Sequence, residues 1–370
     1  MNKPGMDIAF FGSSLVSAYW NGAATYYRGL VRALHGRGHH VRFFEPDAFG
    51  RQQHRDIEDP PWAEVIVYPG EGEMHALRMV EAARGADLVV KASGVGVFDA
   101  LLERALLSLR GPSTRVVFWD VDAPATLDRL EQDPADPFRA LVPCYDLVLT
   151  YGGGQPVIDA YERFGARRCV PIYNALDPST HFPVEPQPHF VADLGLLANR
   201  LPDREARVNE FFLQAAARLH EARFLLGGSG WENKAMPSNV KWIGHVYTAD
   251  HNAFNCTPKA VLNVSRDSMA RYGFSPATRV FEAAGAAACL ITDAWEGIEC
   301  FLEPEREVLV AANGEAVAAQ LEALEAPAAR RIGEAAYARV LAHHTYDHRA
   351  SQLEALLEGR DSAEPARKAA

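Results

Sequence analysis

Short apolar runs alternate with longer segments of helical spacing along most of the chain. The first run, residues 7–11, precedes helical spacing over residues 25–34 and a second apolar run at residues 40–44. Further apolar runs occupy residues 88–90, 116–119 and 147–150. A continuous apolar run is typical of a strand buried in a parallel sheet, and its alternation with helices indicates βαβ units. The pattern therefore predicts an α/β fold.

The composition changes after Pro171. Residues 171–188 contain five prolines and no periodic apolar pattern, which predicts a linker. A second series then begins, in which we expect strands at residues 194–197, 224–226, 240–243, 260–264 and 289–292, and helices at residues 204–219 and 277–287. Residues 328–357 again have helical spacing, with a break near residues 343–347.

The length agrees with two domains, because 370 residues exceed the ~150 that are common for one domain. We expect Rossmann-like domains at residues 1–173 and 189–327, a linker at residues 174–188, terminal helices at residues 328–360 and a disordered tail at residues 361–370.

Charge and composition exclude several classes of protein. The net charge of −11 argues against broad nucleic-acid binding, and no apolar run approaches the ~18 residues of a membrane span. Residues 1–6 lack a secretory pattern. The five cysteines form no C-x-x-C pair, which argues against a zinc site or a disulfide framework. We therefore expect a cytoplasmic protein without a transmembrane segment.

The candidate chemistry is densest at residues 275–293. Ser275 is a suitable N-cap with Pro276 at the first helical position, and Arg279 and Glu282 then fall on one helix face. A helix N-terminus and a guanidinium attract phosphate, and a carboxylate beyond them can bind a ribose diol. These residues predict a nucleotide-sugar site, and the alternative is a buried helix with an Arg–Glu ion pair.

The same segment resembles the donor-binding helix of the GT-B glycosyltransferases, in particular the CgeB-like, group 1-like family. Residues 174–183 (NALDPSTHFP), 193–200 (DLGLLANR) and 223–231 (RFLLGGSGW) extend the resemblance over the C-terminal half. It implies two Rossmann-like domains that face each other across a cleft, with an acceptor side in the first and a donor side in the second. It also implies that a terminal helix crosses back to the first domain.

Ligands of open α/β sheets bind beyond the carboxyl ends of the strands, so we place the remaining donor contacts in the loops that follow strands. Besides Arg279, Glu282 and Ser275, the donor candidates are Asn199, Arg200, Gly228, Ser229, His245, Tyr247, Arg266 and Arg271. Arg200 or Arg266 would bind the diphosphate together with Arg279, and His245 or Tyr247 would contact the nucleobase. Ordinary turns and surface charges are the alternative for each.

The first domain offers acceptor candidates. Gly12, Ser13 and Ser14 follow the first strand, and Asn21 lies further along the same loop. Asp120 and Asp122 follow the strand at residues 116–119, where a carboxylate can deprotonate an acceptor hydroxyl. These two residues also resemble the D-x-D metal motif of the other glycosyltransferase fold, GT-A, and loop capping is a third interpretation.

One departure from the family pattern concerns the sugar. Many retaining GT-B enzymes carry E-x7-E, and Glu282 matches the second glutamate, whereas Phe274 stands in place of the first. Retention or inversion therefore stays open. We expect a hexosyltransferase-like enzyme (EC 2.4) that transfers a sugar from a nucleotide diphosphate donor to an unidentified acceptor without a metal or other cofactor. The alternatives are a sugar-nucleotide epimerase of the same fold and a non-catalytic nucleotide- or sugar-binding protein.

Overall fold

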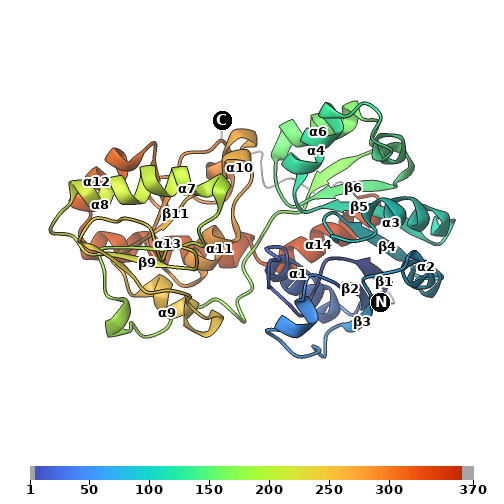
Figure 1. Ribbon diagram of the computed structural model, residues 1–370, viewed down its shortest axis with the longest axis horizontal. Coiled ribbons are helices and arrows are strands. Elements are labelled where there is room, and N and C mark those ends of the chain that lie inside the picture. The colour runs from blue at the N-terminus through green and yellow to red at the C-terminus, as the bar shows by residue number, and fades with distance from the viewer. Residues whose placement is uncertain (1–4, 361–370) are drawn as a thin grey trace. The chain divides into compact units, whose positions relative to one another are not determined.

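The computed structural model describes residues 5–360 and divides them into two units (Figure 1). Unit 1 comprises residues 5–173 together with residues 346–360, and unit 2 comprises residues 174–345. The linker expected at residues 174–188 is thus part of unit 2. The tail expected at residues 361–370 lies outside the described residues.

Unit 1 is built on a seven-stranded parallel sheet in the order β3-β2-β1-β4-β5-β6-β7. Its strands are β1 (Asp7–Phe11), β2 (His40–Asp47), β3 (Glu64–Pro69), β4 (Leu88–Ala92), β5 (Arg115–Asp120), β6 (Leu147–Thr150) and β7 (Cys169–Pro171). The central strands are almost entirely buried, as a parallel sheet that is covered on both faces requires.

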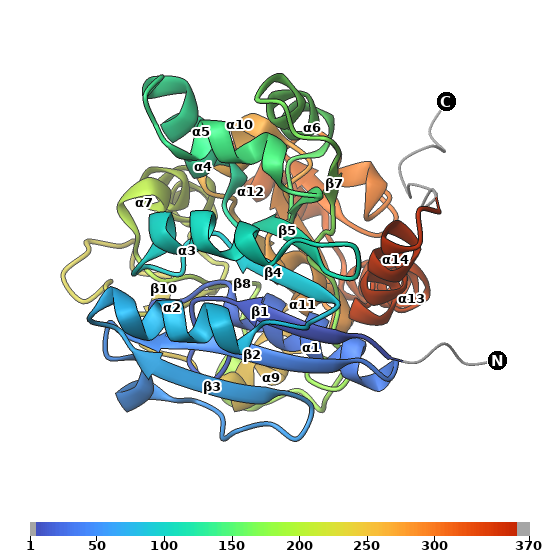
Figure 2. The same cartoon turned by 90° about the vertical axis from the view of Figure 1, so that its right-hand side faces the viewer.

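Helices cover both faces of this sheet. They are α1 (Ala24–Gly36), α2 (Glu73–Ala82), α3 (Asp99–Ala105), α4 (Ala123–Gln132), α5 (Phe138–Leu141), α6 (Gly154–Arg163) and α14 (Tyr346–Leu357). Figure 2 shows α2 and α3 side by side in front of the sheet, whereas α1 lies behind it. The last helix, α14, packs against α1, where Gly29 lets the Tyr346 ring approach the helix backbone.

Unit 2 is built on a six-stranded parallel sheet in the order β10-β9-β8-β11-β12-β13. Its strands are β8 (Leu194–Leu197), β9 (Phe224–Gly227), β10 (Val240–Trp242), β11 (Ala260–Asn263), β12 (Leu290–Asp293) and β13 (Leu309–Ala311). An apolar core of side chains from β8, β9, β11 and β12 holds one face of this sheet to its helices, and a second cluster around Phe254 of α9 includes Leu225 of β9.

The helices of unit 2 also form two layers (Figure 1). One layer contains α7 (Pro202–Val208), the π-helical turn Asn209–Leu213, α8 (Gln214–Arg218) and α12 (Gly314–Ala323). The other contains α9 (His251–Cys256), α11 (Thr278–Gly285) and α13 (Ala326–His343), and α10 (Asp267–Tyr272) connects β11 to α11. No helix among residues 5–360 is both long and apolar enough to cross a membrane.

The predicted α/β class with two parallel Rossmann-like sheets is confirmed. The sequence pattern missed β3, β7 and β13, which are edge strands of the two sheets. The prediction that Ser275 caps the donor helix is wrong. Helix α11 begins at Thr278 with Ala277 as its N-cap, and the Ser275 hydroxyl instead donates to the Gly273 carbonyl at 2.8 Å.

Candidate functional site

The strand order identifies the ligand-binding edge of each sheet. Both orders reverse direction once, between β1 and β4 in unit 1 and between β8 and β11 in unit 2. In open α/β sheets ligands bind at such a reversal, beyond the carboxyl ends of the strands. The loops that follow these four strands therefore surround the two candidate crevices.

In unit 2 the loops after β8 and β9 are bound to each other. The backbone amide of Ser229 donates to Oδ1 of Asn199 at 3.0 Å, and the amide of Arg200 donates to the Ser229 carbonyl at 2.9 Å. Gly228 has φ +125°, and a Cβ at this position would lie 2.1 Å from the Ala198 carbonyl oxygen. Only glycine fits there, so the turn brings four predicted donor residues together.

Arg200 already has a carboxylate partner in this structure. Its Nε and Nη2 donate to the two oxygens of Glu205 at 2.8 and 2.9 Å, and Nζ of Lys234 lies 2.8 Å from the same carboxylate. These hydrogen bonds, first from Arg200 and then from Lys234, lower the pKa of Glu205 to about 2. Lys234 is thus a second cation beside Arg200.

A second group of charged residues surrounds the first turns of α11. Oε2 of Glu282 lies 3.7 Å from Nη1 of Arg279, and Oε1 lies 3.9 Å from Nε2 of His181. One donor atom each of His181, His251 and Glu282 lies within 4.8 Å of the others. Among the described residues, none accepts a hydrogen bond from Nη1 of Arg279, although this nitrogen is buried.

The electrostatics of this group favour an ionised Glu282. Although burial raises it, the guanidinium of Arg279, followed by His181 and His251 in smaller measure, holds the pKa of Glu282 below its ordinary value. Burial, followed by the charge of Arg279, lowers the pKa of His251. Glu282 is therefore a largely buried carboxylate that can accept hydrogen bonds, and Nη1 of Arg279 retains an unused hydrogen-bond donor.

Backbone contacts connect the two groups. The Gly228 amide donates to the Gly244 carbonyl at 2.7 Å, and the Val246 carbonyl lies 3.2 Å from Nε2 of His251. His245 and Tyr247 flank Val246, and their rings meet edge to face at 4.8 Å. Tyr247 is 70% exposed, and an open pocket of about 290 Å³ lies beside His245.

Three other donor candidates lie at the ends of the short helix α10 or after it. Arg266 is the N-cap of α10, and Arg271 is exposed with its guanidinium 5.8 Å from the centre of the Tyr272 ring. Ser275 is buried in the turn that leads to α11. Phe274 has φ +45° and packs its ring on Gly297, so an aromatic side chain occupies the position of the first family glutamate.

In unit 1 the predicted acceptor loop is held together by its own side chains. The Ser13 hydroxyl donates to Oδ1 of Asn21 at 2.9 Å, and Nδ2 of Asn21 donates to the Ser14 carbonyl at 2.9 Å. The Ser14 hydroxyl donates to Glu45, which lies on β2. A Cβ on Gly12 would meet the Phe43 ring at 2.5 Å. These residues shape the loop at the β1/β4 crevice rather than presenting free polar groups.

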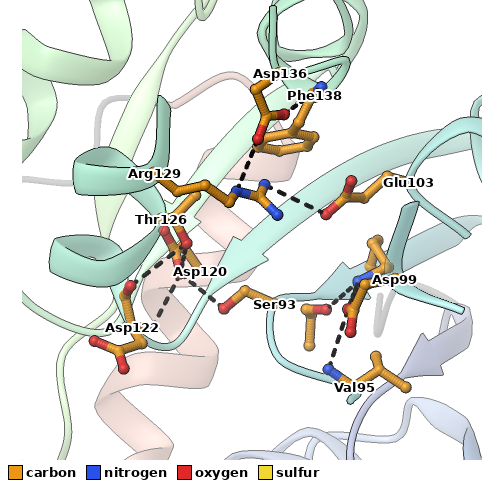
Figure 3. A network of polar contacts seen from close by, with 12 residues as sticks. Ser93, Val95, Asp99, Glu103, Asp120, Asp122, Thr126, Arg129, Asp136 and Phe138 are labelled. Atoms are coloured by element: carbon orange, nitrogen blue, oxygen red, sulfur yellow. Dashed lines mark hydrogen bonds and ion pairs between the residues drawn. The ribbon is translucent and has the colours of Figure 1, made fainter. Parts of the chain in front are cut away.

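Asp120 and Asp122 have different environments (Figure 3). Asp120 is fully buried, and its carboxylate accepts hydrogen bonds from the Ser93 hydroxyl at 2.7 Å, the Asp122 amide at 3.0 Å, and the hydroxyls of Thr126 and Tyr161. Asp122 is the N-cap of α4, and Figure 3 shows its carboxylate directed away from that of Asp120. The two carboxylates are thus not arranged to share one cation.

Comparisons with known proteins agree with this architecture. Residues 204–355 match a family described as "Glycosyl transferase-like". The sucrose-phosphate synthase of Thermosynechococcus elongatus is similar at a TM-score of 0.69 and 16% identity, with 96% of this chain and 98% of that chain covered. HepE of Anabaena, solved with UDP and glucose, gives a TM-score of 0.65 at 15% identity over 96% and 100% of the two chains. An α-glucosyltransferase solved with UDP and a 13-mer DNA gives 0.69 at 11% identity over 96% and 100%.

The fold is that of the GT-B glycosyltransferases. Together with the match at residues 204–355, this fold supports a transferase of the glycosyltransferase class. No curated protein matches the sequence at a significant level.

The structure adds residues that the sequence did not single out. His181 and His251 join Glu282, and Glu205 and Lys234 join Arg200. His181 was visible only as part of the NALDPSTHFP segment, and His251 follows the loop that holds His245. Neither histidine has a sequence spacing that would have connected it to Glu282.

Proposed function

We propose that the chain is a metal-independent, hexosyltransferase-like glycosyltransferase of the CgeB-like group. It transfers a sugar from a nucleotide diphosphate donor to an acceptor hydroxyl. Unit 2 binds the donor and unit 1 binds the acceptor. The GT-B fold and the glycosyl transferase-like match support the class of reaction, and the residues around α11 support the donor.

The observation that carries the proposal is the Arg279–Glu282 pair. Glu282 is a largely buried, ionised acceptor, and Arg279 keeps a buried Nη1 from which no described residue accepts a hydrogen bond. Ribose offers two hydroxyl donors, and a diphosphate offers oxygen acceptors. A nucleoside diphosphate therefore supplies what each side chain lacks, because buried polar groups gain most from a hydrogen-bond partner.

The leaving group determines the electrostatic requirement. Negative charge grows on the diphosphate as the sugar bond breaks, and fixed cations around it stabilise the transition state. Arg279, Arg200 and Lys234 are the cations that we assign to this role, with Arg266 and Arg271 as further candidates. Charge stabilisation by these side chains does not require a divalent ion, so turnover is expected to persist in chelator.

In unit 1 we assign to Asp122 the role of the general base that removes the proton from the acceptor hydroxyl. Its carboxylate follows β5 and is partly exposed, whereas the Asp120 carboxylate is fully buried and already accepts four hydrogen bonds. A general base must reach the proton that it removes, so Asp122 suits that role and Asp120 suits positioning of the loop. The shaped loop around Ser13, Ser14 and Asn21 would border the acceptor.

A thermal-shift screen with nucleoside diphosphates and their sugars tests the donor site. A ligand at ~100 times its dissociation constant stabilises a fold by ~2.7 kcal/mol. Glu282→Gln is expected to lose that stabilisation, and Glu322→Gln, an exposed glutamate on α12, is the matched control. If every ligand raised the melting temperatures of the two variants equally, Glu282 would not be part of the donor site.

Release of nucleoside diphosphate, measured with and without candidate acceptors, separates the alternatives. The replacement of the first family glutamate by Phe274 favours a second candidate, a nucleotide-binding protein without catalysis. Donor binding without any release would support that candidate. Conversion of the donor sugar to its epimer without an acceptor would identify an epimerase.

A further inference from the structure

Two histidines and a carboxylate from three separate segments of unit 2 meet beside α11. His181 comes from the segment before β8, His251 is the first residue of α9, and Glu282 lies on α11. Their donor atoms lie within 4.8 Å of one another. His181 is almost fully buried, the Glu282 side chain is 12% exposed, and His251 has intermediate burial. Within residues 5–360 this is the group of histidine, cysteine and carboxylate side chains that has the spacing of a metal site.

The hydrogen-bond partners of each ring assign its proton to one nitrogen and leave the other nitrogen with a lone pair. Nε2 of His251 lies 3.2 Å from the Val246 carbonyl, which only accepts, so Nε2 carries the proton and Nδ1 keeps a lone pair. The Thr180 hydroxyl donates to the Asp177 carbonyl at 3.1 Å, so it accepts from Nδ1 of His181 at 3.0 Å. Metal-binding histidines typically have this arrangement, with the second nitrogen donating to a carbonyl or other acceptor.

The distances are close to those of a bound ion. Zinc binds imidazole nitrogen and carboxylate oxygen at ~2.0–2.2 Å, which places its ligands ~3.4 Å apart in a tetrahedron. Nε2 of His181 and Oε1 of Glu282 are 3.9 Å apart and all three ligand atoms lie within 4.8 Å of one another, so side-chain rotations would have to bring them closer by up to ~1.4 Å. Gly285 lies one turn after Glu282, and a Cβ there would be 3.2 Å from Cβ of His181, so its absence allows His181 to lie against α11.

The ligand types select the class of ion. Two imidazoles and one carboxylate suit zinc and similar transition-metal ions, whereas magnesium and calcium prefer oxygen ligands. Three protein ligands leave a fourth position open. The Arg279 guanidinium lies 3.7 Å from Glu282, so its positive charge repels a cation that is bound there. This charge lowers the affinity for a dication without blocking the nitrogen ligands.

We propose that His181, His251 and Glu282 form a binding site for Zn²⁺, which competes with the nucleotide donor for Glu282. The competition rests on the donor site proposed above, whereas zinc binding itself does not. Zinc acts here as an inhibitor rather than a cofactor. Removal of the Arg279 charge should therefore strengthen zinc binding, whereas it should weaken diphosphate binding.

The test is a titration of the untagged full chain with Zn²⁺ by calorimetry and with Co²⁺ by visible absorption. His181→Gln, His251→Gln and Glu282→Gln are each expected to weaken binding by at least ~100-fold, since even the loss of a supporting contact costs 10–100-fold. His220→Ala removes an exposed histidine of unit 2 and is expected to bind as the wild type does. Arg279→Met is expected to bind Zn²⁺ ~10-fold more tightly, because a nearby positive charge is removed.

The same variants separate failure of the zinc site from failure of the donor site. Circular dichroism establishes that each variant is folded, and the nucleoside of the best-binding nucleotide is the competitor, because it has no phosphate to chelate zinc. His251→Gln is expected to keep nucleoside binding and lose zinc. If the wild type binds no Zn²⁺ and Glu282→Gln no longer binds the nucleotide, the zinc site is refuted and the donor site is retained. Zinc that binds through the three ligands but is indifferent to nucleoside would overturn the competition.

Discussion

Asp120→Asn is expected to destabilise unit 1 by about 3 kcal/mol or more. The Asp120 carboxylate accepts hydrogen bonds from Ser93, the Asp122 amide and Thr126 through one oxygen, and from Tyr161 through the other. A hydrogen bond to a charged group contributes ~1.5–3 kcal/mol and one to a neutral group ~0.5–1.5 kcal/mol, so each of the three retained bonds weakens by ~1 kcal/mol. The asparagine NH₂ group would also face the Tyr161 hydroxyl, which loses its acceptor.

Thermal unfolding measures this loss. For a domain of the size of unit 1, ~1 kcal/mol corresponds to ~2–4 °C, so the expected decrease in Tm is ~6–12 °C. Trp119, which is buried next to Asp120, provides the fluorescence signal. Asp122→Asn is the control two residues away, and it removes a charge at the N-cap of α4, where such a charge contributes ~0.3–1 kcal/mol. If both variants melted within ~2 °C of each other, the buried carboxylate would not be the centre of this network.

Three other substitutions test the proposed site. Arg279→Ala is expected to weaken nucleoside diphosphate binding by ~1.5–3 kcal/mol and free nucleoside binding much less, as measured by calorimetry; equal losses would indicate a structural arginine. Glu205→Gln is expected to tighten diphosphate binding by releasing Arg200. Because the folded-state pKa of Glu205 is lowered to about 2, its ion pairs stabilise the fold above the ordinary glutamate pKa and lose that effect as the pH falls towards 2. Because the pair is partly exposed, that contribution is small, so the variant should unfold in acid much as the wild type does, and an unchanged diphosphate affinity would contradict the assignment. Asp122→Asn is expected to reduce transfer by ~10²–10⁴-fold with donor binding retained, and a stable variant with full transfer would exclude Asp122 from the chemistry.

The sequence predicted the buried strands well because their signal is local. Strands β1, β6 and β8 have the predicted bounds, since each is a short apolar run that is buried on both faces. Strand β3 has only one buried residue among its six, and β7 and β13 have three residues each. Residues 169–171 (CVP) and 309–311 (LVA) are apolar but too short to stand out as runs, and β3 was missed although residues 65–68 (VIVY) are apolar.

The sequence predicted the proximity of site residues only where the residues follow neighbouring parallel strands. Loops after parallel strands share one edge of the sheet, which is why Asn199, Arg200, Gly228 and Ser229 are neighbours in the structure. Local geometry was less predictable. Ser275 has the residue type of an N-cap, but its hydroxyl bonds backwards to Gly273, and the helix starts three residues later.

Partners that are distant in sequence could not be predicted at all. His181 and Glu282 are separated by 101 positions, and their approach depends on how the segment before β8 packs against Gly285 of α11. The Arg200–Glu205–Lys234 group depends likewise on the conformation of the loop after β9. Tertiary contacts of this kind leave no periodic signal in a single sequence.

The ion pairs of unit 2 indicate which arginines are able to accept a new anion. Arg207 binds Asp293 at 2.6 Å, and Asp293 is fully buried and held by Ser265, so breaking this pair would leave a buried charge. The Arg200–Glu205 pair is partly exposed, and such pairs contribute little stability, so a diphosphate can replace Glu205 at small cost. Arg279 need not lose any hydrogen bond through Nη1 to gain a phosphate. The phosphates should therefore go to Arg279 and Arg200, whereas Arg207 keeps the fold of the β12 loop.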